Sequence, residues 1–230
     1  MTRYIFDIEC NGFLDTVTKL HSLVLMDLDT GLMTSFSYPG EYASLINGEV
    51  ELLEDATELI GHNVIAFDLP VLQKLMPSLK ITAKVTDTLV LSRLIHSDLK
   101  AEDAPRLVAK TITPKLYGSH SLEAWGERLG LYKGNYEGGF EVWSQEMQDY
   151  CEQDVRVTKK LYDYLQPGAY SQRAIALEHD MMSLCADMER EGWPFDVRVA
   201  WNSIVNSQPD ERPSRPNCLP CSHLGKSWTA

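Results

Sequence analysis

Two acidic residues lie two positions apart inside an apolar segment near the start of the chain. Asp7 and Glu9 belong to RYIFDIE (3–9), whose aromatic and β-branched side chains favour a strand. Successive side chains of a strand point to opposite faces, so both carboxylates lie on the same face. Like charges this close repel, and burying either one without a partner costs free energy. The pair therefore needs a compensating interaction, which these residues alone do not identify.

A third acid, Asp68, stands between an apolar segment (64–67) and an apolar helical run. A lone Asp in this position is ordinarily the N-cap of a helix. Asn63, five residues earlier, is equally an ordinary turn residue. Taken alone, this segment does not distinguish a structural role from a functional one.

A fourth acid lies on the apolar face of a long helix. Apolar side chains spaced three and four residues apart run from Met147 to Leu165 and predict a buried helix face. Asp154 falls on that face, one turn after Tyr150. A buried acid needs a cation or a strong set of hydrogen bonds, and a buried Arg and a metal ion are the two candidate cations. In a chain of net charge −12, four acids in apolar surroundings favour a divalent-metal site; they are Asp7, Glu9, Asp68 and Asp154.

The elements that must position these acids form an α/β pattern. Strands are predicted at 3–9, 21–28 and 32–38, with a hairpin turn at 27–31, and shorter strands within 58–67 and near 82–86. Helices are predicted at about 41–54, 69–76, 87–96, 120–129, 144–165 and 171–190. This order indicates an α/β fold with a central mixed sheet flanked by helices.

Composition narrows the function classes. The 230 residues are 44% hydrophobic, enough for one good-sized core. No apolar run of about 18 residues occurs, so no membrane span is expected. The chain enters the first strand without signal-peptide features, and five scattered Cys favour a reducing cytosol, so we expect a cytoplasmic protein. The acidic charge argues against a phosphate-coating DNA binder, although acids that hold divalent cations can face phosphates.

Three short motifs resemble those of a nuclease family. DIE (7–9), HNVIAFD (62–68) and YCEQD (150–154) are similar to the three motifs of the DEDD (DnaQ-like) 3′–5′ exonucleases, whose fold is ribonuclease H-like. The tyrosine four residues before the last aspartate matches the Tyr-type branch of that family. The resemblance therefore implies a ribonuclease H-like mixed sheet and an exonuclease.

Longer blocks resemble one group within that family. DTLVLSRLIHSDLK (87–100), GSHSLEAWGERLG (118–130) and REGWPFD (190–196) are similar to the proofreading exonuclease domain of bacteriophage family-A DNA polymerases. The resemblance covers roughly residues 3–196. It implies a proofreading role in DNA replication, with hydrolysis of single-stranded or frayed DNA 3′ ends to nucleoside 5′-monophosphates, in the host cytoplasm.

The resemblance also assigns roles to the acids. In such enzymes two divalent ions about 4 Å apart hold both sides of the scissile phosphodiester, and Mg²⁺ or Mn²⁺ suits the hard oxygen ligands. Asp7 would bridge both ions, while Glu9 and Asp154 complete the ligands of one. Asp68 would hold the second ion through water, and Tyr150 would orient the attacking water.

Other residues are weaker candidates for substrate binding. Phe13 stands where the family usually has a wedging Leu, and its ring can stack on a base; a core residue is the alternative. Asn63 is expected to hold the substrate or a neighbouring acid, with a turn role as the alternative. The densest basic stretch is expected to guide single-stranded DNA, with a solvated loop as the alternative; it holds Lys100, Arg106, Lys110 and Lys115.

The end of the chain differs in character. We expect an exonuclease domain at 1–170, a helical extension resembling the start of a polymerase portion at 171–205, and a disordered tail with four prolines at 206–230. Cys218 and Cys221 form a CxxC without a second ligand pair, so zinc is not expected. Three histidines near the motifs are interpreted as structural: His62, His96 and His120.

The expected partners are single-stranded DNA 3′ ends and a separately encoded polymerase portion, with no membrane. Thioredoxin is not expected, because the insertion through which some phage polymerases recruit it has no counterpart in the sequence. Two alternatives remain, a 3′–5′ exoribonuclease acting on short RNA and a non-catalytic partner module of a split polymerase. The complete acidic set with Tyr150 disfavours the second, because a scaffold has no use for buried like charges.

Overall fold

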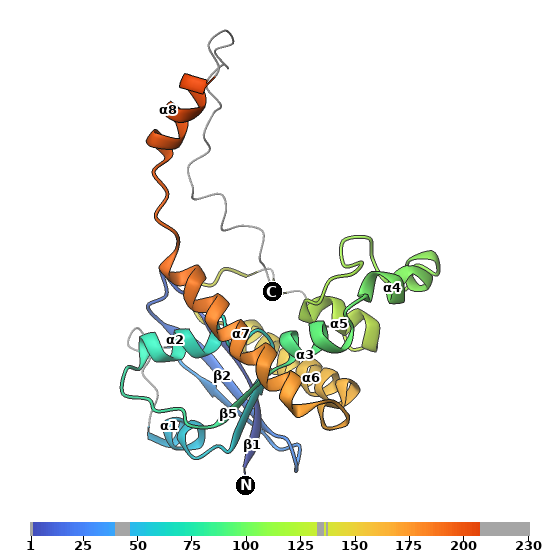
Figure 1. Ribbon diagram of the computed structural model, residues 1–230. Coiled ribbons are helices and arrows are strands. Elements are labelled where there is room, and N and C mark those ends of the chain that lie inside the picture. Colours follow the sequence, from blue (N-terminus) through green and yellow to red (C-terminus); the bar gives the residue numbers. More distant parts are fainter. Residues whose placement is uncertain (1, 40–46, 133–135, 137, 208–230) are drawn as a thin grey trace. The chain divides into compact units, whose positions relative to one another are not determined.

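The computed structural model describes residues 2–39, 47–132, 136 and 138–207 (Figure 1). The chain divides into two compact units, with the division between Ala186 and Asp187. The first unit contains the sheet and all four acids singled out above; the domain boundaries expected from the sequence stay predictions. None of the described helices combines the length and apolar character that a membrane crossing requires.

A mixed five-stranded sheet forms the centre of the first unit. Its strands are β1 (Arg3–Cys10), β2 (Leu20–Asp27), β3 (Met33–Ser37), β4 (Glu58–Gly61) and β5 (Lys84–Asp87). They are ordered β3-β2-β1-β4-β5. The β1–β2 and β2–β3 pairs are antiparallel, whereas the β1–β4 and β4–β5 pairs are parallel. The prediction of an α/β fold with a mixed sheet is therefore confirmed.

The alternation of side chains along β1 separates two helical layers. Phe6 and Ile8 pack in one core with residues of α1 (Asn47–Glu54) and α2 (Asp68–Leu75). Ile5 packs on the opposite face, against Cys151 of α6 (Gln145–Leu165). Asp7 and Glu9 share the face of Ile5, so they lie under α6. Figure 1 shows α1 and α2 on one side of the sheet and α6 on the other.

A second core lies among the helices beyond the α6 face. It surrounds the fully buried Trp125 and joins α6 to α3 (Thr88–Ile95), α5 (Leu122–Leu129) and α7 (Gln172–Glu191). The ends of two of these helices follow the sequence signals. Ser144 caps α6 by accepting the Met147 N–H at 3.1 Å, and Gly130 ends α5 in a left-handed conformation at φ 64°.

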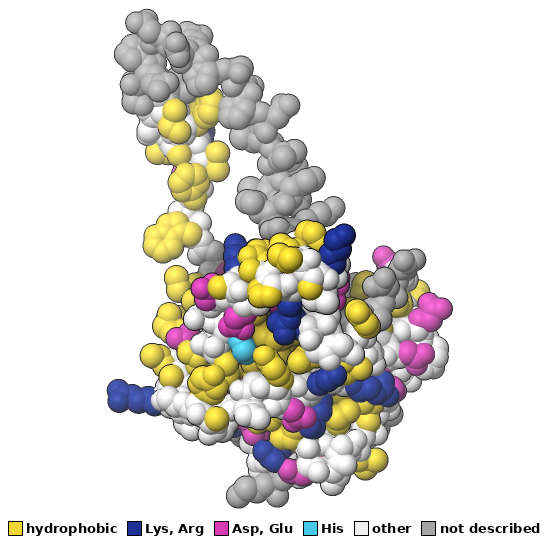
Figure 2. All heavy atoms as spheres, turned by 90° about the vertical axis from the view of Figure 1, so that its right-hand side faces the viewer, with side chains coloured by type: hydrophobic (Ala, Val, Ile, Leu, Met, Phe, Trp, Pro, Cys, Tyr) yellow, Lys and Arg dark blue, Asp and Glu magenta, His cyan; other side chains and the backbone are white. Residues whose placement is uncertain are grey.

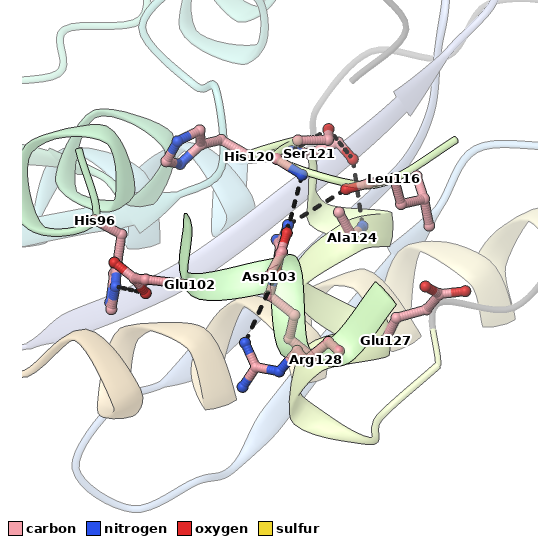
Figure 3. A network of polar contacts seen from close by, with 12 residues as sticks. His96, Glu102, Asp103, Leu116, His120, Ser121, Ala124, Glu127 and Arg128 are labelled. Atoms are coloured by element: carbon pink, nitrogen blue, oxygen red, sulfur yellow. Dashed lines mark hydrogen bonds and ion pairs between the residues drawn. The ribbon is translucent and has the colours of Figure 1, made fainter. Parts of the chain in front are cut away.

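One helix was missed by the sequence prediction. Residues 99–108, interpreted as part of a possible solvated loop, form α4 (Leu99–Val108), although Pro105 lies inside it. Tertiary contacts hold this helix in place: Asp103 forms an ion pair with Arg128 of α5 at 2.6 Å, and both side chains are fully buried (Figure 3). Asp103 also accepts the Gly118 N–H at 2.9 Å. A local sequence pattern does not reveal an ion pair between residues that are far apart in the chain. For this reason helix α4 was not predicted.

The C-terminal part of the described chain is helical. A short 3₁₀ turn (Pro167–Ala169) follows α6, and α7 buries Ile175, His179 and Ala186. The second unit contains α8 (Val197–Ser207), at the helical extension expected from the sequence. The expected disordered tail beyond residue 207, the beginning of the helix predicted at 41–54, and Cys218, Cys221 and any zinc bound to them lie outside the described residues.

Candidate active site

The first two acids lie side by side on the central strand. Asp7 and Glu9 of β1 are both half-buried. On the neighbouring strand β2, Val24 pairs with Asp7 and Ser22 pairs with Glu9. The pairing shifts register between Glu9 and Cys10, at the point where β1 leaves the sheet. Such a bulge ends the regular pairing and turns the chain away. The two carboxylates are therefore held on a rigid central strand close to its end.

Helix α6 places Cys151 against this part of β1, and Asp154 follows on the same buried face. The Cys151 thiol donates to the backbone oxygen and Oδ2 of Asp7, each at 3.5 Å. One potential ligand atom from each of Asp7, Glu9 and Cys151 lies within 4.8 Å of the others. Asp154, one turn further along α6, is only 3% exposed. Burial, followed by the negative charge of the neighbouring carboxylates, raises the pKa of the Cys151 thiol.

Asp68 approaches the same place from α2. It is 4% exposed and lies in the first turn, while Phe67 occupies the N-cap position without a side-chain cap, so the N-cap interpretation of Asp68 is wrong. Burial raises the pKa of Asp68 to about 7, and the charges of Asp87 and Asp154 add to the rise. Hydrogen bonding from the backbone of Asp68 and Ile8 opposes it. The structure therefore brings Asp68 near both β1 and α6.

The donor set fits divalent cations. Burial, and then the charges of Asp87 and Asp154, already raise the proton affinity of Asp68. A divalent cation relieves that repulsion as protons do, and carboxylate oxygens are its preferred ligands. Cys151 adds a softer donor atom that the sequence analysis did not consider. The residues that could hold a metal ion are Asp7, Glu9, Asp68, Asp154 and Cys151.

Tyr150 lies on α6 next to this cluster. Its side chain is half-buried, and its ring packs against the ring of Tyr136 with centroids 5.8 Å apart. The Tyr136 hydroxyl in turn donates to the Gly139 carbonyl at 2.8 Å. The ring of Tyr150 is thus held by packing, which leaves its hydroxyl as the chemically useful group.

The turn after β1 presents Phe13 to solvent. Phe13 is 67% exposed, so the alternative that it is a core residue is wrong. The turn itself is tightly held: Asn11 Oδ1 accepts the N–H groups of Thr18 and Lys19 at 2.9 Å each, and Lys74 Nζ of α2 donates to the Leu14 carbonyl at 2.6 Å. An exposed aromatic ring on a fixed turn beside the acids is well placed to stack on a base.

Asp87 is a residue that the sequence analysis did not single out. It ends β5, is fully buried, and caps α3 by accepting the Leu89 N–H at 2.9 Å. It also accepts the Asn63 N–H at 2.8 Å. Asn63 itself adopts a left-handed backbone at φ 66°, which supports its turn role. An Asp followed by Thr before an apolar helical run was the available signal, since this pattern is typical of an N-cap.

The basic candidates are distributed differently from the acids. Lys100 and Arg106 lie on α4, where Arg106 contacts Asp103 at 3.6 Å. Lys110 and Lys115 are exposed, and Lys115 contacts Glu123 at 3.5 Å. On the face shown in Figure 2, Lys and Arg side chains are interspersed with acidic ones and form no single continuous patch. These residues supply positive charge at several points of the surface.

The three histidines near the motifs contact protein side chains. His62 Nδ1 lies 2.9 Å from Thr88 Oγ1, and His96 Nδ1 lies 2.8 Å from Glu102 Oε2. His120 Nδ1 lies 3.0 Å from Ser92 Oγ, and burial lowers the pKa of His120 to about 4. These contacts agree with the structural interpretation, and Figure 3 shows His96 and His120 near the Asp103–Arg128 pair.

Comparisons with known proteins agree with this architecture. The chain is 34% identical to the DNA-directed DNA polymerase of Enterobacteria phage T3 over 238 residues and equally identical to that of Escherichia phage T7 over 239 residues. Each match covers 85% of this chain and 34% of the relative, so the chain spans about a third of the length of these curated relatives. The resemblance to bacteriophage DNA polymerases is therefore confirmed.

Solved structures share the fold. A structure described as the apo form of a nuclease and that of Brucella melitensis NrnC bound to pGG each match with a TM-score of 0.56 and 20% identity. The matches cover 85% of this chain and 88% and 89% of those chains. Residues 4–166 match the RNase_H_2 family, described as the RNase_H superfamily. This match includes all four acids and the whole sheet except Arg3, and the chain belongs to the RNase_H superfamily.

Proposed function

We propose that this chain is a metal-dependent 3′–5′ exonuclease that hydrolyses single-stranded or frayed DNA 3′ ends to nucleoside 5′-monophosphates. The superfamily and the relation to phage polymerases support a nuclease. The observation that carries the finer proposal is the group of Asp7, Glu9 and Cys151 at the end of the central strand. The charge of Asp154 acts on Cys151 and on Asp68. Hydrolysis of a phosphodiester by water is one of the reactions that a pair of divalent cations held by carboxylates promotes, and it agrees with the superfamily.

The acids of the cluster and Tyr150 would have different roles. Asp7 and Glu9 on the rigid strand, with Asp154 on α6 and Asp68 on α2, would hold two divalent ions, Mg²⁺ or Mn²⁺. Bound there, the ions supply positive charge for the phosphodiester and lower the pKa of a bound water. The hydroxyl of Tyr150 would accept a hydrogen bond from the attacking water and direct it.

The substrate would be held by its last nucleotide. Phe13 would stack on the terminal base, because its exposed ring lies on the turn that directly follows β1. Lys100, Arg106, Lys110 and Lys115 would draw the single strand towards the site by their charge, and Asn63 would hold the turn before Asp68. Base stacking on an exposed ring requires an unpaired base, so separated strand ends are the substrate form that the exposed Phe13 favours.

The biological role proposed here is proofreading for a DNA polymerase. The T3 and T7 relatives are DNA polymerases, and the chain matches about a third of their length. The partner would be a polymerase portion encoded separately, and thioredoxin is not part of the proposal. A second substrate, short RNA, is proposed as the alternative, because NrnC, a protein of this fold, has been solved with pGG.

The test is hydrolysis of 5′-labelled oligonucleotides of one sequence in DNA and RNA, with Mg²⁺, Mn²⁺ or EDTA. We expect a ladder that shortens from the 3′ end of the DNA, requires metal, and stops when the 3′ nucleotide is joined by a phosphorothioate. Faster hydrolysis of the RNA would support the alternative substrate. Internal cuts, or equal hydrolysis in EDTA, would overturn the proposal.

Asp7→Ala is the variant that tests the site directly. It removes a carboxylate that lies close to Glu9 and Cys151, and hydrolysis should fall at least about 1,000-fold, which is about 4 kcal/mol of barrier. The variant should fold, because removing one charge relieves repulsion among the rest. A near wild-type rate with an unchanged melting temperature would show that the acids named here are not the site.

A further inference from the structure

The segment that leads to Asp68 is a tight turn whose backbone is held by a residue from another part of the chain. It runs from Gly61, where a Cβ atom would lie 2.1 Å from Val64 Cγ1 and 3.0 Å from the Phe6 carbonyl oxygen, through Asn63 with its left-handed backbone. A turn with so little room has one workable path. Its backbone N–H groups need acceptors, and the sheet supplies none beyond Gly61, the last residue of β4.

Both carboxylate oxygens of Asp87 supply those acceptors. Oδ1 accepts the Asn63 N–H at 2.8 Å, and Oδ2 accepts the Ile65 N–H at 3.1 Å. Oδ1 also accepts the Leu89 N–H, so the same group caps α3. Asp87 is fully buried and committed to three backbone donors. It is therefore built to fix the turn, and it is not arranged as a further metal ligand.

The backbone of Asp87 is itself tied to α7. The Asp87 N–H donates to His179 Nε2 at 2.9 Å, and His179 Nδ1 lies 2.7 Å from the Ile175 carbonyl oxygen. A carbonyl only accepts, so Nδ1 carries the proton and Nε2 is the acceptor. His179 is 9% exposed. One chain of hydrogen bonds thus runs from α7, through Asp87, to the turn that precedes Asp68.

We propose that Asp87 and His179 are positioning residues that set the place of Asp68 relative to the acids of β1 and α6. Asp87 holds the turn directly, and His179 acts through the Asp87 backbone. This inference rests on the proposed function in one respect, that Asp68 binds a metal ion. Partners that orient metal ligands typically change metal affinity about 10–100-fold when removed, so effects of this size are expected.

Two pairs of variants test this in the full chain. Asp87→Asn keeps the Oδ1 acceptor but turns an NH₂ group towards the Ile65 N–H. Its control is Asp98→Asn, which changes another helix N-cap Asp, on α4, whose side chain accepts only a cap hydrogen bond from Ala101. His179→Leu removes the acceptor at similar volume, whereas His179→Gln retains an acceptor and is the conservative rescue.

The readouts are Mn²⁺ affinity by titration calorimetry and hydrogen exchange of the Asn63 and Ile65 amides. Asp87→Asn and His179→Leu should bind Mn²⁺ about 10-fold or more weakly and exchange these amides faster. Asp98→Asn and His179→Gln should behave as the wild type. If Asp87→Asn does not fold, the two His179 variants decide. Equal Mn²⁺ affinity in His179→Leu and His179→Gln, or wild-type affinity in a folded Asp87→Asn protein, would overturn the proposal.

The outcome separates this inference from the proposed function. A wild-type protein that binds Mn²⁺ through Asp68 but hydrolyses no nucleic acid would leave the positioning role intact and remove the exonuclease. If the wild type hydrolyses nucleic acid but the positioning variants bind Mn²⁺ with unchanged affinity, the exonuclease stands and the positioning role is overturned. A wild-type protein that binds no Mn²⁺ would overturn both.

Discussion

The burial of Asp68 predicts a pH-dependent loss of stability that metal ions should cancel. Asp68 is 4% exposed, and burial with the charges of Asp87 and Asp154 raises its pKa from 3.8 to about 7. At pH values between these two pKa values, Asp68 of the metal-free protein is protonated in the folded state and ionised in the unfolded state. Stability therefore falls as the pH rises through this window and reaches its full penalty above pH 7.

The size of the effect follows from the shift. A rise of about three pKa units, at about 1.4 kcal/mol per unit, costs the folded state about 4 kcal/mol when Asp68 is ionised. Asp68→Asn carries no such charge and should lose none of this stability. The free energy of unfolding of the wild type minus that of Asp68→Asn should therefore decrease by up to about 4 kcal/mol between pH 4 and pH 8.

The assay is urea denaturation in EDTA at several pH values, with Asp15→Asn as the control because Asp15 is an exposed acid. Asp15→Asn should follow the wild-type profile. Adding Mn²⁺ at pH 8 should stabilise the wild type more than Asp68→Asn, since the cation replaces the lost proton. Parallel pH profiles of the wild type and Asp68→Asn would show that Asp68 ionises as it does in water, and the reasoning about crowded carboxylates would fail.

Two further predictions concern the tyrosine and the buried ion pair. Tyr150→Phe keeps the packing on Tyr136 and removes only the hydroxyl, so hydrolysis should fall roughly 10–1,000-fold with Mn²⁺ affinity unchanged; weaker Mn²⁺ binding would assign Tyr150 to the metal site instead. Arg128→Met removes the nearer of the two arginines that contact the fully buried Asp103, leaving Arg106 at 3.6 Å, and should cost about 3 kcal/mol in urea denaturation. Arg156→Met, which removes a surface contact to Glu152, should cost about 1 kcal/mol or less, and equal losses in the two variants would contradict this account.

The sheet could be predicted because its signals are local. Alternation along β1 and the turn between β2 and β3 appear directly in the residue types, and the caps of α5 and α6 are single residues, Ser121 and Ser144. Helix α4 could not be found in this way. Its Pro105 argues locally for a break, and what holds the helix is an ion pair between Asp103 and Arg128, which are 25 residues apart.

The candidate site was predictable for a different reason. Asp7, Glu9 and Asp154 each contradict the apolar pattern around them, and such a contradiction is visible without a structure. It implies a compensating partner but does not say which one. The structure adds that Cys151 lies close to Asp7 and Glu9. The apolar stripe concealed this, because a buried Cys is ordinary on such a face.

The two aspartates at helix starts show where sequence reasoning reaches its limit. Asp68 and Asp87 both precede apolar helical runs, and the same N-cap rule applies to each. Only Asp87 obeys it: its carboxylate caps α3 and is satisfied by backbone donors. Asp68 lies one position too late to cap α2, and its burial is opposed by neighbouring charges. Both carboxylates are buried and both accept backbone N–H groups, but Asp87 uses its two oxygens to fix a turn and cap a helix, whereas Asp68 lies beside the charge of Asp154. This distinction needs the positions of groups that are far apart in the sequence.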